Sequence, residues 1–527
     1  MKDQYFIGID IGSSSVKSAI FDTQGNELGE ARRNNPLSQP RAGVAEYNGP
    51  QILKSILSAI QDLLVQSNVP PKDVAALCLD GMISGTMGID AAGEATTPYT
   101  TTLDTRFTPH LDHVLEQFHD PIREQTGSGQ PTFAPKMLWL RDEFSDLYRK
   151  TAKFVTITSY VSGKMAGLSG NEAFVDHTHL WATGLSDTRH YRWSDDLCKA
   201  MDLPIEKLPR IVKSSEIIGK LSADMATSTG LLSGTPIVAG AGDQSVGYIA
   251  AGLTQPGRMV NVAGTYSNVA FCTNEFRPDL EHRMAEIFPS PVVGLWNPVS
   301  YVIGAGLTHR WFEETFAVPD EVAAEKPGPP KSAFDDLDKR ASQLPPGSEK
   351  LVFIPHLGGR ACPNQTNFRG TWLGITWTHR REHFYRALME SIAYDHYLSY
   401  QTLQASYPEA QVAEIMVYGG GARNALWNQI KADVMGLPYV SLDRQDLSTL
   451  GDAILAGYAV GVYDDLASTA KRFIQQTKRF EPRADVHRFY GQYTEYYRLL
   501  LEQVEPAYDN LAGLDNWDNG GAREERS

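Results

Sequence analysis

Cysteine is scarce in this sequence. The four cysteines lie far apart along the chain, at Cys78, Cys198, Cys272 and Cys362. Metal-binding and redox motifs need cysteines a few residues apart, and a disulfide framework needs a much denser set. We therefore expect neither, and interpret the four as small buried residues of a reduced compartment.

Long uncharged apolar stretches are also absent. No run approaches the ~20 residues that a transmembrane helix needs. The first residues, MKDQYFIGID, lack the basic start and the apolar segment of a signal peptide. We therefore expect a soluble, cytoplasmic protein.

Positive charge is in deficit. Lysine and arginine number 48 against 63 aspartates and glutamates, which gives a net charge of −15 over 527 residues. Such a surface repels phosphate backbones and anionic lipids, so we expect no nucleic-acid or membrane partner. An anionic ligand would need a local site built from backbone N–H groups, helix ends or a bound cation.

The patterns that are present indicate an α/β fold. Residues 5–22 alternate in polarity, break at a Gly-Ser-Ser-Ser turn and resume alternation, which predicts two strands joined by a tight turn. Residues 50–66 have apolar residues at helical spacing, and residues 74–79 form a short apolar run typical of a buried strand. Strands that alternate with helices are typical of α/β proteins.

The middle of the chain repeats this plan. Residues 234–243 predict an apolar strand that ends on an aspartate, and a helix follows over residues 244–252. Residues 258–272 then repeat the order of strand, Gly-Thr turn and strand. We therefore expect two homologous halves, each of which opens with the same hairpin.

Two familiar phosphate-binding signatures are missing, since the sequence has neither G-x-x-x-x-G-K-[ST] nor G-x-G-x-x-G. Instead it has the two Gly-Ser/Thr hairpin turns and a third glycine cluster over residues 419–424. Small residues at such corners let backbone N–H groups approach phosphate oxygens, and the hydroxyls add donors. One such turn means little, but two in matching positions of two halves predict a phosphate site.

Two acidic residues accompany these turns. Asp10 lies in the first hairpin strand beside Gly12, where it is either a magnesium ligand or a carboxylate held by neighbouring N–H groups. Asp243 ends an apolar strand and opens a helix. There it is either a base that accepts the proton of an attacking hydroxyl or a helix N-cap.

Three other patterns favour structural roles. His177 and His179 could form a metal pair, but no third ligand is near. Residues 490–501 predict an amphipathic helix docked on its own lobe. A cluster of four aromatic residues is interpreted as core packing rather than as a stacking platform; it comprises Trp372, Trp377, Phe384 and Tyr385.

The order of these segments resembles the FGGY family of carbohydrate kinases, within the actin-like ATPase superfamily. The similar stretches run from Tyr5 to about Tyr463: IGIDIGSSSVKSAIFD, PKMLWL, GAGDQSVGYIAAG, NVAGTYSNV, FIPHLGGRACP, FRGTWLGITWTHRREHFYRALMESIA and YGGGARNALWNQIKADVMGLP. The last two are close to the family's own signature regions. The resemblance covers nearly the whole folded chain and is specific to the family, though not to one substrate.

The resemblance implies two actin-like lobes, an N-terminal lobe over residues 1–254 and a C-terminal lobe over 255–505, with ATP and a sugar in the cleft between them. The polar residues beyond predict a flexible tail over 506–527.

The resemblance also implies roles for individual residues. Asp243 resembles the family's catalytic base, and Asp10 the acid that positions magnesium. The residues that match nucleotide-binding positions are Gly12, Ser13, Ser14, Gly264, Thr265, Gly306, Arg310, Gly420 and Asn424.

On the sugar side the resemblance implies six contact residues: Ile83, Ser84, Asp104, Arg106, Asp243 and Gln244. Ketopentose kinases of the family carry a GQMHG-like stretch where this sequence has GMISG, so Ser84 replaces the usual histidine. The shorter side chain cannot reach where a histidine would, so the acceptor differs or a water intervenes. Asp452 is a second departure, because the family has Gly-Ala-Ala where this sequence has Gly-Asp-Ala.

We therefore predict an enzyme that uses ATP and magnesium to phosphorylate a hydroxyl of a sugar, a ketose such as a pentulose of the xylulose or ribulose type. One alternative acceptor is a short polyol or a linear signalling ketose, such as glycerol, a tetritol or an autoinducer-type molecule. A second alternative is a non-catalytic nucleotide-binding regulator on the same fold, but retention of Asp10 and Asp243 argues against it. Family members are often dimers, so a homodimer is a further possibility.

Overall fold

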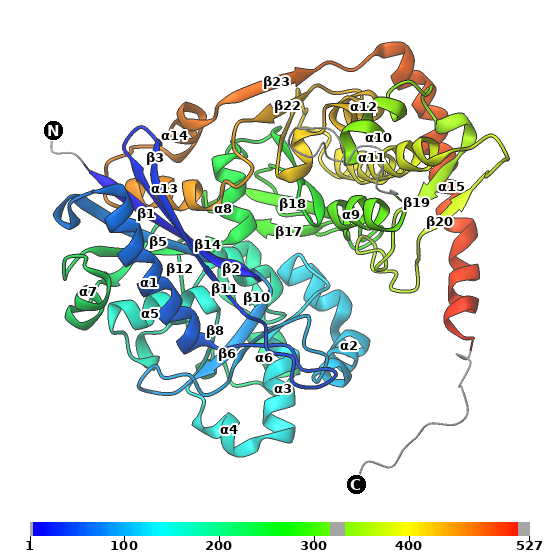
Figure 1. The fold of residues 1–527 in the computed structure, drawn as a ribbon. Helices are drawn as coiled ribbons and strands as arrows, with labels where there is room; N and C mark the ends of the chain where they lie inside the picture. The colour runs from blue at the N-terminus through cyan, green and yellow to red at the C-terminus, as the bar shows by residue number, and fades with distance from the viewer. Residues whose placement is uncertain (1–3, 317–332, 515–527) are drawn as a thin grey trace, which may run out of the picture.

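The computed structural model describes residues 4–316 and 333–514. They form two lobes, each built on a twisted β-sheet that is flanked by helices (Figure 1). Within these ranges no helix is long and apolar enough to cross a bilayer. All four cysteines are buried and unpaired, as predicted.

The N-terminal lobe has a six-stranded sheet in the order β13-β14-β5-β1-β2-β3. Its strands are β1 (Tyr5–Ile11), β2 (Ser15–Asp22), β3 (Glu27–Asn34), β5 (Val74–Gly81), β13 (Ile217–Lys220) and β14 (Pro236–Gly242). Alternate residues of β1 face opposite sides of the sheet. Ile7 and Ile9 pack toward helix α1 (Gly49–Ser67), whereas Gly8 faces helix α13 (Ser448–Ala459).

The C-terminal lobe has a seven-stranded sheet in the order β17-β18-β16-β15-β21-β22-β23. Its strands are β15 (Met259–Ala263), β16 (Ser267–Phe271), β17 (Glu286–Pro289), β18 (Trp296–Val302), β21 (Ile415–Tyr418), β22 (Tyr439–Leu442) and β23 (Gln476–Phe480).

The two sheets share one topology. The run β3-β2-β1-β5-β14 has two antiparallel pairings followed by two parallel ones. The run β18-β16-β15-β21-β22 has the same pairings in the same order. Both predicted hairpins are confirmed, and the equivalent strand orders show that the predicted repeat is structural.

Smaller sheets and the remaining helices surround these cores. The short strands are β4 (Glu46–Tyr47), β6 (Gly85–Ile89), β7 (Tyr99–Thr101), β8 (Lys153–Val155), β9 (Phe174–Asp176), β10 (Ser186–Asp187), β11 (Arg192–Trp193), β12 (Arg210–Val212), β19 (Val352–Ile354) and β20 (Thr371–Leu373). The helices are α2 (Thr108–Thr126), α3 (Phe133–Glu143), α4 (Ser145–Lys150), α5 (Ile157–Ala166), α6 (Asp195–Ala200), α7 (Ala223–Thr229), α8 (Asp243–Ala250), α9 (Ala305–Phe316), α10 (Ala333–Ala341), α11 (Arg381–Ser406), α12 (Ala425–Met435), α14 (Leu466–Phe473) and α15 (Ala484–Ala512).

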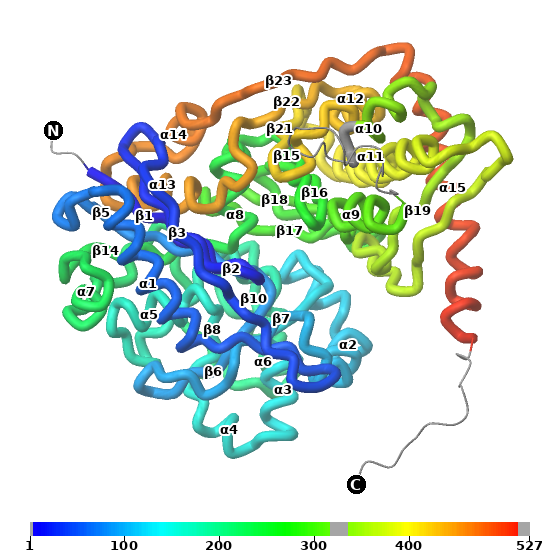
Figure 2. The backbone as a smooth tube through the Cα atoms, viewed as in Figure 1, coloured from blue at the N-terminus to red at the C-terminus, as the bar shows by residue number. Residues whose placement is uncertain are grey.

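Two helices from late in the sequence pack on the N-terminal lobe. Figure 2 shows α13 and α14, in orange, beside the blue strand β1. A Cβ on Gly8 would lie 2.1 Å from the carbonyl oxygen of Thr449 in α13, so this approach requires glycine. Because α13 also packs against α8, the two helices join the lobes at the base of the cleft.

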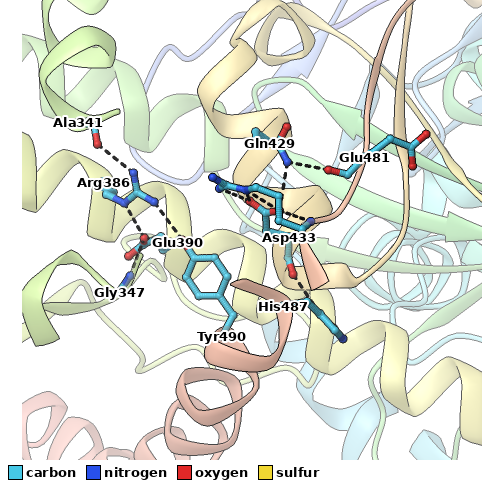
Figure 3. Close-up of polar contacts among 10 residues, drawn as sticks. Ala341, Gly347, Arg386, Glu390, Gln429, Asp433, Glu481, His487 and Tyr490 are labelled. Atoms are coloured by element: carbon cyan, nitrogen blue, oxygen red, sulfur yellow. Dashed lines mark hydrogen bonds and ion pairs between the residues drawn. The ribbon is translucent and has the colours of Figure 1, made fainter. Parts of the chain in front are cut away.

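The predicted amphipathic helix is confirmed and docks on its own lobe. Figure 3 shows α15 held against α11 by a buried polar group: Arg386 and Tyr490 both donate to Glu390, at 2.8 and 2.7 Å. The helix continues to Ala512, so the flexible tail predicted from residue 506 is wrong over residues 506–512. Tyr508 is buried there and donates to Thr371 at 2.7 Å, and this tertiary contact keeps a polar segment helical.

The aromatic cluster is only partly a core. Trp372 stacks on Phe353 with ring centroids 4.2 Å apart, and Tyr385 is buried. Trp377, however, is 99% exposed, so the prediction of core packing is wrong for this residue. It lies in the turn beyond β20, where no other element covers it.

Candidate functional site

A cavity of about 1000 Å³ lies between the two lobes and gathers most of the predicted site residues. Its walls are the two hairpin turns, the starts of α8 and α9, the glycines at 419–421 and the first residues of α12. The predicted residues that line it are Asp10, Gly12, Ser13, Ser14, Asp243, Gln244, Gly264, Thr265, Gly306, Arg310, Gly420 and Asn424.

The first hairpin turn presents two hydroxyl groups. The Gly12 N–H donates to the Ser15 carbonyl at 3.0 Å, which closes the turn between β1 and β2. Asn35 holds the turn from the side, since its Nδ2 donates to the Gly12 carbonyl at 2.8 Å. Ser13 and Ser14 are thereby exposed at the tip of a fixed turn, which suits them to bind phosphate oxygens.

The second hairpin turn has the same design and adds a helix N-terminus. The Thr265 carbonyl accepts from the Gly306 N–H at 3.2 Å, at the start of α9. A Cβ on Gly306 would lie 2.3 Å from the carbonyl oxygen of Gly264, so only glycine fits. The N-terminal turn of α9 therefore lies at the same cavity as Thr265, where its dipole favours an anion.

An acidic cluster of three residues, Asp10, Asp80 and Asp452, lies beneath the first turn. Asp10 is paired with Asp80 in the register of β1 and β5, and Asp452 of α13 accepts from the Ile9 N–H at 3.0 Å. Apart from the neighbouring carboxyl groups of Asp10 and Asp452, no donor among the described residues reaches either carboxyl oxygen of Asp80. Burial, reinforced by neighbouring carboxyl groups, raises the pKa of all three acids. Protons or a cation must therefore relieve their repulsion.

Asp446 lies beside the acidic cluster and was missed by the sequence analysis. Lys17 of β2 bridges it to Glu30, with 3.1 Å from its Nζ to each carboxylate. Burial opposes ionisation of Asp446, but Lys17 outweighs this effect and lowers the pKa of its carboxyl group. Asp446 lies four residues beyond the end of β22, so the signal used for Asp243, an aspartate directly after an apolar strand, would have pointed to Asp443 instead.

The donor set here fits a magnesium ion bound mainly through water. In residues 4–316 and 333–514, no group of three or more His, Cys, Asp or Glu side chains is arranged to hold a metal by itself. Magnesium commonly takes one or two carboxylates and completes its shell with waters and substrate phosphates. Asp10 supplies such a carboxylate at the cavity wall, next to the first hairpin turn.

Asp243 lies where β14 becomes α8. Gly242 is the N-cap, so the alternative role of Asp243 as an N-cap is not what the structure shows. One carboxylate oxygen accepts from the Gln244 N–H at 2.7 Å, and the turn is fixed because the Gly242 N–H donates to Thr178 at 2.9 Å. Burial raises the pKa of Asp243 to about 6, so it is ionised at neutral pH and still able to accept a proton.

Gln244 is oriented by side chains from both lobes. Its Oε1 accepts from the Tyr301 hydroxyl at 2.8 Å and lies 3.2 Å from the Tyr248 hydroxyl. Because the carbonyl end is held by the protein, the amide NH₂ is the donor available at the cavity wall.

The far end of the cavity is lined by the C-terminal lobe. Asn424 caps α12 by accepting from the Trp427 N–H at 2.9 Å, and its Nδ2 donates to Asp338 at 2.9 Å. Tyr385 donates to the same carboxylate at 3.0 Å. Asp338 and Trp427 also line this end. Trp427 lies within the quoted stretch YGGGARNALWNQIKADVMGLP, but the sequence analysis gave it no role. Asp338 had no motif to point to it, because its partners Tyr385 and Asn424 lie 47 and 86 residues away along the chain.

Four predicted sugar contacts lie outside the cavity lining: Ile83, Ser84, Asp104 and Arg106. Asp104 and Arg106 pair with each other, and Arg106 also pairs with Glu46. These charges are therefore satisfied within the N-terminal lobe. Ile83 packs against Gly242, directly before Asp243, and Ser84 is partly exposed in the turn between β5 and β6.

The histidine pair is structural, as the sequence favoured. Both rings are buried. His179 bonds to Asp176 at 2.5 Å, and His177 bonds to the carbonyl of Ser290 at 2.9 Å.

Comparison with known protein families gives two adjoining matches. Residues 5–250 match the N-terminal domain of the FGGY family of carbohydrate kinases, and residues 259–460 match the C-terminal domain of the same family. The two matches follow the order of the two sheets along the chain.

Relatives of similar length differ in the acceptor they are named for. The xylulose kinase of Bacillus subtilis (strain 168) is 28% identical over 97% of this chain and 98% of its own length. The gluconokinase of the same strain is 25% identical over 96% and 98%. The autoinducer-2 kinase of Klebsiella pneumoniae subsp. pneumoniae is 26% identical over 97% and 94%.

Solved structures share the two-lobed fold. The gluconate kinase from Lactobacillus acidophilus has a TM-score of 0.87 at 22% identity, over 97% of this chain and 100% of that chain. A ligand-bound xylulose kinase from the same organism has a TM-score of 0.86 at 22% identity, over 96% and 100%. With both family domains matched and this fold observed, the chain belongs to the FGGY family of carbohydrate kinases, enzymes that transfer phosphate from ATP to a sugar.

Proposed function

We propose that this kinase phosphorylates a hydroxyl of a ketose, a pentulose of the xylulose or ribulose type. The observation that carries the proposal is that Asp243 and the two hairpin turns line one cavity. The similarity to a xylulose kinase over nearly the full length of both chains supports this acceptor class.

In the proposed reaction the polyphosphate of ATP lies across the two hairpin turns, with the adenosine toward Gly420 and Asn424. Asp243 accepts the proton of the attacking hydroxyl, and the amide of Gln244 donates to an oxygen of the acceptor. Magnesium beside Asp10 would neutralise charge on the phosphoryl oxygens. The N-terminal lobe thus supplies the base and the C-terminal lobe most of the nucleotide site.

A second acceptor class is favoured by Ser84. Because this residue replaces a histidine that ketopentose kinases present to their substrate, a gluconate-like acid, a short polyol or a linear signalling ketose is the alternative acceptor. The gluconokinase and autoinducer-2 kinase relatives support keeping this alternative.

The test is ATP consumption by the purified protein with magnesium, measured against pentuloses, hexuloses, gluconate, tetritols, glycerol and the autoinducer. We expect one pentulose to stimulate turnover most, and Asp243→Asn to remove that stimulation. Asp224→Asn, at an exposed aspartate of α7, is the matched control and should keep it. Turnover with gluconate, glycerol or the autoinducer but with no ketopentose would overturn the pentulose proposal.

We also infer that the enzyme works in the cytoplasm, where ATP is abundant and thiols stay reduced. The four free, buried cysteines support this inference.

A further inference from the structure

Lys431 of α12 is fully buried on the nucleotide side of the cavity. Its side chain is 0% exposed, and its Nζ donates to Asn261 Oδ1 at 2.9 Å. The same ammonium lies 3.7 Å from the centroid of the Trp427 ring, which lines the cavity. No carboxylate of the described residues forms an ion pair with it, so this buried charge has only a neutral amide and a π face as partners.

Lys431 lies beneath the hairpin that carries the second turn. Asn261, its hydrogen-bond partner, donates in turn to Ser267 Oγ at 3.2 Å and to the Asn268 carbonyl at 2.8 Å. These residues begin the strand that leaves the turn, whereas Asn261 lies in the strand that enters it. The Asn261 side chain therefore links the ammonium to both strands of the hairpin whose turn contains Gly264 and Thr265.

The groups that face Lys431 do not balance its charge. His309 of α9 and His396 of α11 are its titratable neighbours. Burial, with a smaller effect of Lys431 itself, lowers the pKa of each to about 3, so both rings are neutral at pH 7. Asp433, on the same helix, pairs instead with Arg483.

An unbalanced buried ammonium is costly to a folded protein, and burial lowers the pKa of Lys431 to about 7. An anion placed nearby would favour the charged form and remove much of that cost. The second hairpin turn, which with the N-terminus of α9 would hold such an anion, closes the hairpin that carries Asn261, and Trp427 lines the same cavity. Both residues that contact Lys431 therefore belong to the structure around this anion position.

We propose that Lys431 is a positioning residue for the polyphosphate of ATP, a buried positive charge whose counter-charge is the nucleotide itself. Lys431 does not touch the phosphates. The electrostatic attraction of its ammonium group acts on them across the hairpin, and its hydrogen bond to Asn261 supports the strands that carry the turn. This inference rests on the proposed placement of the phosphates at the two hairpin turns. It predicts that Lys431 discriminates between ligands by their phosphate charge and not by their base.

The test uses Lys431→Met, which keeps the length of the side chain and removes the charge. Calorimetry of ATP, ADP and adenosine without acceptor sugar should show ATP bound about tenfold more weakly and ADP several-fold more weakly, with adenosine unchanged. The matched control is Lys136→Met in the N-terminal lobe. Lys136 is 1% exposed and donates to Thr86 and Thr100 at 2.7 Å, but it does not line the cavity, so the ratio of ATP to adenosine affinity should stay as in the wild type.

A second measurement starts from the pH dependence of ATP binding in the wild type. In the wild type, Lys431 loses its proton as the pH rises through about 7 in the free protein. ATP binding should therefore weaken relative to adenosine binding between pH 7 and 9. Comparison with Lys431→Met at each pH cancels the titration of ATP itself, and the variant should lack the additional loss.

The outcomes separate this inference from the proposed function. Equal weakening of ATP and adenosine would overturn it in favour of packing beneath Trp427, and an unchanged affinity for both would overturn it outright. Either result leaves the kinase proposal intact as long as the wild type binds ATP. A wild type that binds no ATP would overturn both.

Discussion

The two hairpin turns share one backbone design but differ in the charge beneath them. The turn of the N-terminal lobe lies over the acidic cluster of Asp10, Asp80 and Asp452. The hairpin of the C-terminal lobe has Lys431 beneath it, held by Asn261 of its first strand. Since the strand orders of the two sheets are equivalent, the difference arises from side chains one layer below the cavity and not from the fold.

This difference suits the two ends of one ligand. A magnesium complex of ATP combines a divalent cation with several phosphate charges. An acidic layer under one turn favours the cation, and a basic layer under the other favours the phosphates. A duplicated scaffold can thus become asymmetric through a few buried substitutions, while its exposed serine and threonine turns remain alike.

The largest expected effect leaves both turns intact and removes only the base. Asp243→Asn should lower kcat by about 10³-fold or more, because no other carboxylate occupies the start of α8 to accept the hydroxyl proton. The affinity for ATP, measured by calorimetry, should change less than about twofold. Near-normal turnover in this variant would remove Asp243 from the base role.

The next largest effect is expected when a carboxylate is removed from the acidic cluster beneath the first turn. Asp10→Asn should raise the magnesium concentration needed for half-maximal activity by about 10–100-fold, since a carboxylate beside the first turn is lost. Lys431→Met, assayed at an ATP concentration that saturates it, should leave that concentration unchanged. Magnesium titrations of both variants provide the check, and an equal shift in the two would contradict the division of roles.

A smaller effect is expected when a Cβ is added at the glycines that hold the two turns, Gly306 and Gly12. Gly306→Ala places a Cβ 2.3 Å from the Gly264 carbonyl oxygen, so the turn must shift, and we expect KM for ATP to rise about tenfold. Gly12→Ala meets its nearest atom, the Ser15 carbonyl oxygen, at 3.1 Å and should have the milder effect. Gly491→Ala in α15, where a Cβ meets no atom within 4 Å, is the control. Steady-state kinetics would contradict this reasoning if Gly12→Ala were the more damaging change.

The smallest effect at working pH concerns the acid limb of the pH profile. The base must be ionised, and the pKa of Asp243 is about 6, so kcat/KM for the acceptor, measured at saturating ATP, should be constant above that pH and fall about tenfold per unit below it. Lys431→Met should not move this limb, because the two groups belong to different sides of the site. A profile that stays flat down to pH 5 would rule out Asp243 as the titrating base.

Much of the fold could be predicted because its signals are local. Alternating polarity and Gly-Ser/Thr turns predicted both hairpins, and helical spacing predicted α1. Asp10 and Asp243 could be singled out for the same reason, since each lies beside a turn or a strand end that is visible in the sequence.

The predictions that failed depended on what a residue meets in space. Trp377 was expected in the core but is exposed. The tail was expected from residue 506, yet Tyr508 extends the helix by packing on its own lobe. Composition and spacing do not report such partners.

The sequence by itself determined the two-lobed α/β plan, the two Gly-Ser/Thr hairpin turns and the place of Asp243 between a strand and a helix, because periodicity and turn chemistry act over a few residues. Only the tertiary structure decided which charges lie beneath those turns. Lys431 and Asn261 are separated by 170 residues, and Asp452 meets Ile9 across 443. Burial and electrostatic repulsion act through space, so the charge of each half of the site is set by neighbours that the order of residues along the chain does not reveal.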